Sequence, residues 1–301
     1  MTLPERVRIC EMGPRDGLQN EDAVVATADK VRYVDMLSEA GLPLVETTSF
    51  VSPKAIPQLS DASDVYRQIK KRPGTRYLAL VPNLKGLERA RAAGADSVAV
   101  FTAASETFTK KNINMTIAQS LSTFSEVVSA ARAGAMWVRG YVSTSFGCPY
   151  EGAVPVAKVV EVARALHDMG AQEISIGDTI GVGIPNQVFE IVAALRPHIP
   201  VEKLALHLHD TRGTALANVL AGLQSGVSIF DSSAGGLGGC PYAPGASGNL
   251  GTEDLLYMLD RMGIRTGVDI GKVRDASRFI AGVLGHGLSS KVFIVMEAQS
   301  A

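Results

Sequence analysis

Two histidines separated by a single residue, His207 and His209, have the spacing of a pair of metal ligands. Alternate side chains of a β-strand share a face, so both imidazoles would point the same way, with Cα atoms about 6.5 Å apart. Two imidazoles in that arrangement can converge on one divalent ion. A histidine that packs in the core or caps a carbonyl group gives the same pattern, so the place of the pair in the fold decides between these interpretations.

Asp16 is the expected carboxylate partner of this pair. It follows a short apolar segment, residues 7–11, and closure of the sheet into a barrel would bring it close to the strand that carries the histidines. A mixed nitrogen and oxygen site with open positions suits Mg²⁺ or Mn²⁺ better than structural zinc. Asn249 could add a neutral oxygen if its segment folds back, although an Asn beside Gly248 is also a common turn residue.

Arg15 directly precedes Asp16, and a guanidinium beside a metal is suited to hold an enolate or carboxylate oxygen as charge develops. The dipeptide is equally compatible with a surface ion pair in a turn. Glu46 and Asp178, on two later strands, either orient Arg15 and the metal ligands or transfer protons themselves. We predict that these three residues and Cys240 form the catalytic set.

Cys240 lies in a glycine- and proline-rich segment, residues 235–251, that is too long for a simple connection and that we expect to be a catalytic loop. A cysteine kept for packing belongs in an apolar strand or helix, as Cys10 does, so the polar loop favours a reactive role for Cys240. The glycines match neither G-x-G-x-x-G at the start of a helix nor G-x-x-x-x-G-K-[ST]. No nucleotide-cofactor loop is therefore expected.

The elements that would position these residues follow a repeated pattern. An amphipathic stretch ends at a glycine and a short apolar, β-branched segment follows, at Gly41, Gly94, Gly134, Gly170 and Gly226. We expect each glycine to take the left-handed conformation that closes a helix before the next strand. Five copies of one helix-to-strand join predict a parallel sheet.

Three more segments, residues 7–11, 77–81 and 204–208, bring the strand count to eight, each followed by a helix-compatible stretch. This number favours a closed (β/α)8 TIM barrel over an open doubly wound sheet. The whole chain, residues 1–301, fits one such domain, with additional C-terminal helices at about 252–285. Barrel enzymes build their sites at the carboxyl ends of the strands. The polar residues there are Glu11, Arg15, Asp16, Glu46, Arg139, Asp178, His207, His209 and Asp231.

Composition points to small-molecule partners. With 29 Lys and Arg against 30 Asp and Glu, the net charge of −1 offers no basic field for nucleic acid or an anionic membrane. No run approaches the roughly 20 apolar residues of a membrane span. Three widely spaced cysteines suggest neither a disulfide framework nor a cysteine zinc site, and no signal peptide precedes the first strand, so we expect a cytoplasmic protein. A homodimer is left open.

With these positions in view, the chain resembles the hydroxymethylglutaryl-CoA lyase family over essentially its whole length. The matching stretches are residues 13–21, 46–54, 177–183, 207–211, 236–243 and 245–250. Isopropylmalate and homocitrate synthases share the metal-site stretches, whereas residues 46–54 and the Cys240 loop single out the lyases. One departure is Asp22, where family members can carry a lysine. A C-terminal extension with a redox-sensitive cysteine, present in eukaryotic members, is not expected here.

The resemblance implies a metal-dependent retro-Claisen cleavage of 3-hydroxy-3-methylglutaryl-CoA to acetyl-CoA and acetoacetate. It also implies that Arg15 steadies the thioester enolate and that Cys240 moves the proton. The metal ligands implied are Asp16, His207, His209 and Asn249. Three alternatives stay open: a lyase for another 3-hydroxyacyl-CoA, a Claisen-condensing acyltransferase of the same superfamily, and a barrel that only binds ligands.

Overall fold

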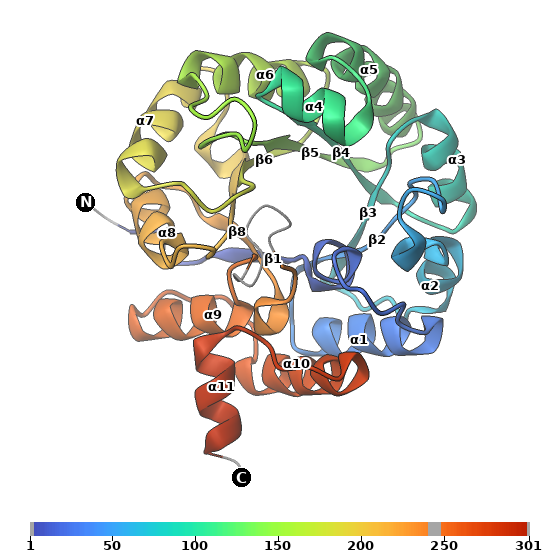
Figure 1. The fold of residues 1–301 in the computed structure, drawn as a ribbon, viewed down its shortest axis with the longest axis vertical. Coiled ribbons are helices and arrows are strands. Elements are labelled where there is room, and N and C mark those ends of the chain that lie inside the picture. Colours follow the sequence, from blue (N-terminus) through green and yellow to red (C-terminus); the bar gives the residue numbers. More distant parts are fainter. Residues whose placement is uncertain (1–2, 240–247, 300–301) are drawn as a thin grey trace.

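The computed structural model describes residues 3–239 and 248–299. Eight parallel strands close into a barrel in chain order, with β8 pairing with β1, which confirms the predicted (β/α)8 fold (Figure 1). The strands are β1 (Arg8–Glu11), β2 (Leu44–Ser49), β3 (Arg76–Leu80), β4 (Ser97–Ala103), β5 (Trp137–Ser143), β6 (Glu173–Asp178), β7 (Leu204–Leu208) and β8 (Ile229–Ser232).

Helices surround the barrel, and α9, α10 and α11 gather on one side of it, next to α1 (Figure 1). None of the helices in the described ranges is long and apolar enough to cross a membrane. The helices are α1 (Thr27–Glu39), α2 (Ala62–Gln68), α3 (Leu84–Ala92), α4 (Glu106–Ile113), α5 (Ile117–Ala133), α6 (Val156–Asp168), α7 (Pro185–Leu195), α8 (Ala215–Gln224), α9 (Thr252–Arg261), α10 (Ile270–Leu284) and α11 (Lys291–Ala298). Short turns are η1 (Gly13–Gly17), η2 (Pro57–Leu59), η3 (Val201–Lys203) and η4 (Ala234–Gly236).

Four of the five predicted glycine joins take the left-handed conformation, with φ between 83° and 109°. They are Gly41, Gly94, Gly170 and Gly226. The prediction is wrong at Gly134, whose φ is −86°, because the reversal falls one residue later, at Ala135 with φ 56°. A Cβ atom at position 134 would lie 2.7 Å from Nη2 of Arg91, the end of an exposed and flexible side chain that can move aside.

The C-terminal region is more helical than the sequence pattern predicts. Helices α9 and α10 confirm the additional helices expected at about 252–285, but α11 was not predicted. Its eight residues follow the N-cap Ser290, whose side chain accepts a hydrogen bond from the backbone N–H of Phe293. Phe293 is buried and joins the main core. A second helix between β4 and β5, α4, is likewise additional to the one-helix-per-strand pattern.

The interior of the barrel is divided by chemistry. On β1–β4 it is mostly apolar, with Cys10, Leu44, Leu78 and Ala99 in one buried cluster, although Glu46 of β2 is also buried. Toward β5–β8 it is polar. The buried polar residues there are Arg139, Glu173, Ser175, Asp178 and Asp231. Because all strands are parallel, their carboxyl ends meet at one face, and the polar half leads directly to it.

Gly222 allows α8 to lie close to the strands that carry the histidine pair. A Cβ atom at this position would lie 2.6 Å from Leu206 Cδ1 and 3.1 Å from Phe230 Cε1. Leu206 belongs to β7 and Phe230 to β8. Even a single methyl group would therefore push α8 away from these two strands.

We predict that Gly222→Ala lowers the free energy of unfolding by about 1–3 kcal/mol, because overpacking outweighs the better helix propensity of alanine. Gly282, in the last turn of α10, is the control, since nothing lies within 4 Å of a Cβ atom there. Gly282→Ala should raise the free energy of unfolding by about 0.5–1 kcal/mol. Denaturant unfolding followed by circular dichroism measures both, and a Gly222→Ala variant as stable as the wild type would contradict this packing.

Candidate active site

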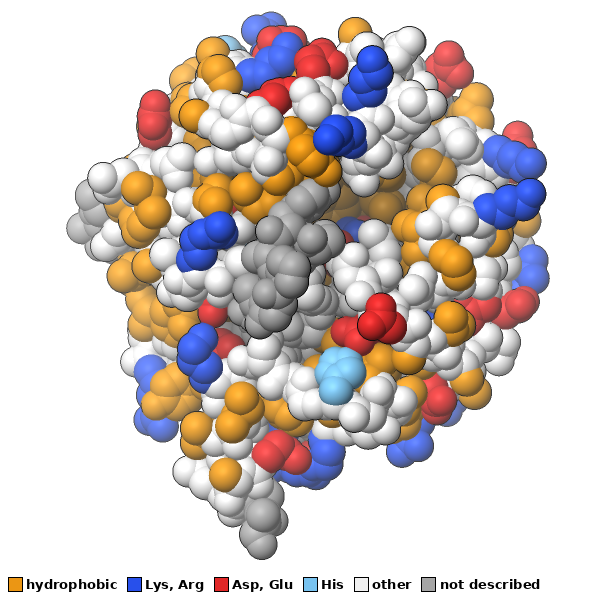
Figure 2. All heavy atoms as spheres, in the orientation of Figure 1, with side chains coloured by type: hydrophobic (Ala, Val, Ile, Leu, Met, Phe, Trp, Pro, Cys, Tyr) orange, Lys and Arg blue, Asp and Glu red, His pale blue; other side chains and the backbone are white. Residues whose placement is uncertain are grey.

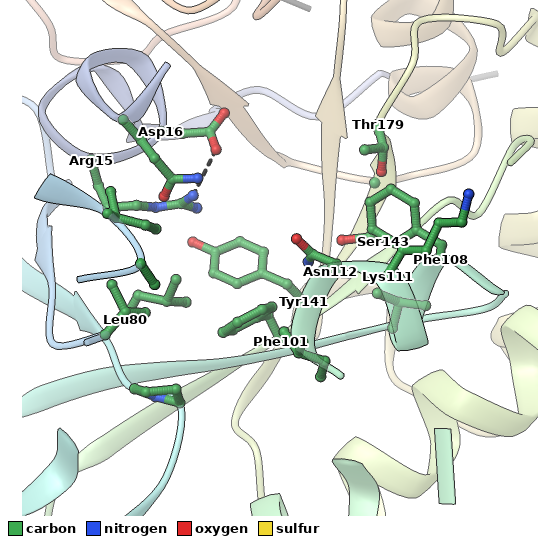
Figure 3. Close-up of a pocket in the computed structure, with 18 of the residues that line it drawn as sticks. Arg15, Asp16, Leu80, Phe101, Phe108, Lys111, Asn112, Tyr141, Ser143 and Thr179 are labelled. Carbon is green, nitrogen blue, oxygen red and sulfur yellow. Dashed lines mark hydrogen bonds and ion pairs between the residues drawn. The ribbon is translucent and has the colours of Figure 1, made fainter. Parts of the chain in front are cut away.

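A cavity of about 680 Å³ opens at the carboxyl ends of the strands. Figure 2 shows a hollow in the face turned toward the viewer, with hydrophobic side chains on its wall. Arg15 and Asp16 lie at one end of the cavity, Lys111 and Asn112 at the other, and Tyr141 between them (Figure 3). The volume is within the range of small-molecule and cofactor sites, and the polar groups are concentrated at the two ends.

Asp16, His207 and His209 meet at one wall of this cavity. One ligand atom from each lies within 4.8 Å of the other two. The Nε2 atoms of the two histidines are 3.2 Å apart, and His207 Nε2 is 4.0 Å from Asp16 Oδ2. Asp16 belongs to η1, directly after β1, and the histidines stand at and just beyond the end of β7. The structure thus brings together three of the four residues predicted to bind metal.

The charge states of these groups suit a divalent cation. Burial opposes ionisation of Asp16, but Arg15 and the two histidines outweigh it and hold the pKa of this carboxyl well below its usual range. Burial and the neighbouring His207 lower the pKa of His209 to about 3, so His209 is neutral at pH 7. An ionised carboxylate and a neutral imidazole are the forms that bind metal. Burial opposes protonation of His207, but its hydrogen bond to Asp231 and the charges of Asp231 and Asp16 outweigh burial and raise its pKa, so a metal bound there would displace a proton. With that proton lost, the donor set fits a divalent ion.

Asn249 reaches the same place because its segment folds back onto β7. The Asp210 N–H donates to Gly248 O at 2.7 Å, and the Leu250 N–H donates to Leu208 O at 3.1 Å. The side chain of Asn249 is buried, and its Nδ2 donates to Asp16 Oδ2 at 2.9 Å. The segment that carries Asn249 does fold back, which was the condition for its place in the predicted metal site. Its side chain lies beside the carboxylate of Asp16.

Arg15 lines the cavity and is held in place from two sides. Its Nη1 donates to Asp16 Oδ1 at 2.6 Å, and its Nε donates to Glu46 Oε2. Glu46 has no exposed surface and is not among the residues that line the cavity. Burial raises the pKa of Glu46, and the positive charge of Arg15 opposes that rise. Glu46 thus contacts Arg15 from behind and fixes the direction of its guanidinium.

Asp178 has a different environment from the other predicted residues. It is fully buried, and its two carboxylate oxygens accept the backbone N–H groups of Val182 at 3.0 Å and Gly183 at 2.9 Å. Burial raises its pKa. It does not line the cavity, and in this structure it holds the loop between β6 and α7. Cys240, the remaining predicted catalytic residue, lies outside the described residues.

Sequence reasoning gave no role to three residues that the structure connects to the site. Asp231 Oδ2 lies 3.3 Å from His207 Nδ1, and Arg139 pairs with Asp231 at 2.6 Å. Tyr141 lines the cavity and accepts a hydrogen bond from Arg139 Nη1 at 3.0 Å. Arg139 and Asp231 stood among the polar strand residues, but their contacts depend on cross-strand register. Tyr141 carried no signal beyond its place two residues after Arg139.

Known proteins match this chain over nearly its full length. A family model described as HMGL-like matches residues 6–280. The mitochondrial hydroxymethylglutaryl-CoA lyase of Rattus norvegicus is 58% identical over 291 residues, which cover 97% of this chain and 90% of that protein.

Solved structures agree with this match. A crystal structure of hydroxymethylglutaryl-CoA lyase from Pseudomonas aeruginosa superposes with a TM-score of 0.97 at 50% identity, covering 99% of this chain and all of that one. An HMG-CoA lyase from Acinetobacter baumannii, in complex with coenzyme A and 3-methylmalate, has a TM-score of 0.91 at 40% identity over 97% of this chain and 95% of that one. By sequence and by structure, this chain belongs to the HMGL-like family.

Proposed function

We propose that this chain catalyses the metal-dependent retro-Claisen cleavage of 3-hydroxy-3-methylglutaryl-CoA to acetyl-CoA and acetoacetate. The observation that carries the proposal is the convergence of Asp16, His207 and His209 beside Arg15 at one end of the cavity. The names of the relatives support the same reaction, and the coenzyme A complex of one neighbour supports an acyl-CoA substrate.

The reaction moves one proton off the substrate and one onto the product. The 3-hydroxyl group loses its proton, its oxygen becomes the ketone of acetoacetate, and the bond between C2 and C3 breaks. The electron pair of that bond forms the enolate of the thioester, which takes up a proton to give acetyl-CoA. The site must therefore favour loss of the hydroxyl proton, stabilise the enolate oxygen and deliver a proton to carbon.

Asp16, His207, His209 and Asn249 would hold the metal, with Mg²⁺ or Mn²⁺ as the proposed ion. When bound there, a divalent ion supplies Lewis acidity toward the substrate hydroxyl group. The side chains do the rest of the positioning. Asp16 carries a full negative charge, and Asn249 hydrogen-bonds to it.

Arg15 is proposed to stabilise the enolate. Two sides of its guanidinium are fixed by Asp16 and Glu46, so its orientation is set before substrate binds. A preorganised cation in a water-excluded site stabilises developing charge more than a mobile one, because no reorganisation is needed during the reaction. Glu46 acts through Arg15 in this proposal, and Asp178 acts by holding the loop after β6.

Cys240 is proposed to protonate the enolate, with residues 235–251 as the catalytic loop of a single-domain chain. The described part of this segment is fixed on both sides. Glu253 accepts the N–H of Gly235 at 2.7 Å, and Ser233 donates its N–H to Leu250 O at 2.9 Å.

The cytoplasm is the proposed location, since Cys10 and Cys148 are free thiols and a reducing compartment keeps them so. Subcellular fractionation tests this, and light scattering tests the homodimer, which stays a prediction.

Purified protein supplied with Mg²⁺ or Mn²⁺ should release acetyl-CoA from 3-hydroxy-3-methylglutaryl-CoA, and a chelator should stop the release. A coupled assay measures acetyl-CoA and acetoacetate, and the two products should form in equal amounts. Absence of turnover by protein that still binds metal would contradict the proposed substrate.

His209→Ala should weaken Mn²⁺ binding by more than the roughly 10–100-fold seen when only a hydrogen-bond partner of a ligand is removed. The reason is that His209 offers a neutral nitrogen directly to the cluster. His198→Ala, at an exposed histidine, is the control and should bind Mn²⁺ like the wild type. Calorimetric titration of metal-free protein gives the affinities, and equal binding by His209→Ala and wild type would rule out this ligand.

Cys240→Ser should lower kcat by about 10²–10⁴-fold, the range for loss of a proton-transfer group, while Mn²⁺ affinity stays unchanged. Cys148→Ser is the matched control, because Cys148 is a buried thiol within 3.0 Å of the Ser105 hydroxyl and serine preserves that contact. Steady-state kinetics of both variants decides the matter. Near-normal turnover in Cys240→Ser would remove its proton-transfer role.

A further inference from the structure

Asp231 stands directly beside His207 in the barrel wall. The two residues are cross-strand partners in the pairing of β7 with β8. Asp231 Oδ2 lies 3.3 Å from His207 Nδ1, on the side of the imidazole away from Asp16 and His209. Asp231 is 1% exposed, so no bulk water competes for this contact.

The carboxylate of Asp231 is itself fixed. Arg139 Nη2 donates to its Oδ1 at 2.6 Å, and Ser175 Oγ donates to its Oδ2 at 2.9 Å. Arg139 is fully buried and forms a second ion pair, 2.9 Å long, with Glu173. The guanidinium therefore lies between two carboxylates, and only Asp231 of the two is the cross-strand partner of His207.

An ionised carboxylate can only accept hydrogen bonds, so the contact with Asp231 requires the hydrogen of a neutral His207 to be on Nδ1. The lone pair is then on Nε2, the atom that faces His209 Nε2 at 3.2 Å and Asp16 Oδ2 at 4.0 Å. His209 has no equivalent support, because its buried Nδ1 lacks a hydrogen-bond partner within the described ranges. The two histidines of the pair are therefore not equivalent.

We propose that Asp231, held by Arg139, is a positioning residue that fixes His207 in its Nδ1–H tautomer and so prepares Nε2 to bind metal. This inference rests on the metal site of the proposed function. A carboxylate that orients a metal-binding imidazole also raises its basicity as a ligand. The competing explanation is that Asp231 only balances the buried charge of Arg139.

Asp231→Asn separates the two explanations. Arg139 still requires an acceptor, so the amide oxygen should take the place of Oδ1, and the amide nitrogen should then face His207 Nδ1. That nitrogen donates, which favours the Nε2–H tautomer and directs a hydrogen toward the ligand cluster. Mn²⁺ affinity should fall by about 10–100-fold, the usual effect of losing such a partner.

Glu173→Gln is the matched control. It removes the same charge from the same buried arginine, but residue 173 pairs with Arg139 across the sheet, whereas His207 pairs with Gly177. Glu173 also pairs with Arg8, so the two variants are compared in metal affinity and not in stability. A role in charge balance alone predicts the same metal affinity for both variants. The proposal predicts that only Asp231→Asn changes the tautomer and the metal affinity.

The experiment is long-range ¹H–¹⁵N correlation NMR of metal-free protein labelled at histidine, with His207 assigned by loss of its signals in His207→Gln. At a pH at which His207 is neutral, the wild type and Glu173→Gln should show its hydrogen on Nδ1, and Asp231→Asn should show it on Nε2. An Nε2–H tautomer in the wild type would overturn the proposal, as would equal loss of Mn²⁺ affinity in both variants. The wild-type spectrum decides even if Asp231→Asn does not fold. Because neither metal nor substrate is present, the result is independent of the proposed reaction.

Discussion

Inside the barrel, Arg139 and Asp231 form an ion pair with no exposed side-chain surface, and the arrangement of the site depends on it. Buried charges are costly unless each is paired and hydrogen-bonded. Arg139 meets this condition because it also pairs with Glu173 and donates a hydrogen bond to Tyr141. Since Asp231 also contacts His207, the polar core and the metal site form one connected network.

Three separate stretches of chain supply the site, and closure of the barrel brings them together. Asp16 follows β1, the histidines end β7, and Asn249 arrives from a segment that hydrogen-bonds back to the end of β7. Arg15 joins the same cluster through Asp16, and Glu46 holds it from β2. Most of these groups are fixed by contacts that exist without substrate, which suits electrostatic stabilisation of a short-lived anion.

The sequence allowed the barrel and the core of the candidate site to be predicted, for physical reasons. The period of two in a strand aligns His207 with His209, and parallel strands place Asp16 at the same face. Contacts set by register could not be predicted. The neighbours of Asp231 depend on which residues of β7 and β8 pair.

The most direct test of the central claim is a crystal structure of the protein grown with Mn²⁺, with anomalous scattering used to locate the ion. The account predicts one ion at the carboxyl ends of the strands, bound by Asp16, His207 Nε2 and His209 Nε2, with His207 Nδ1 still on Asp231. An ion bound elsewhere, or a His207 that turns away from Asp231 to bind it, would contradict the account.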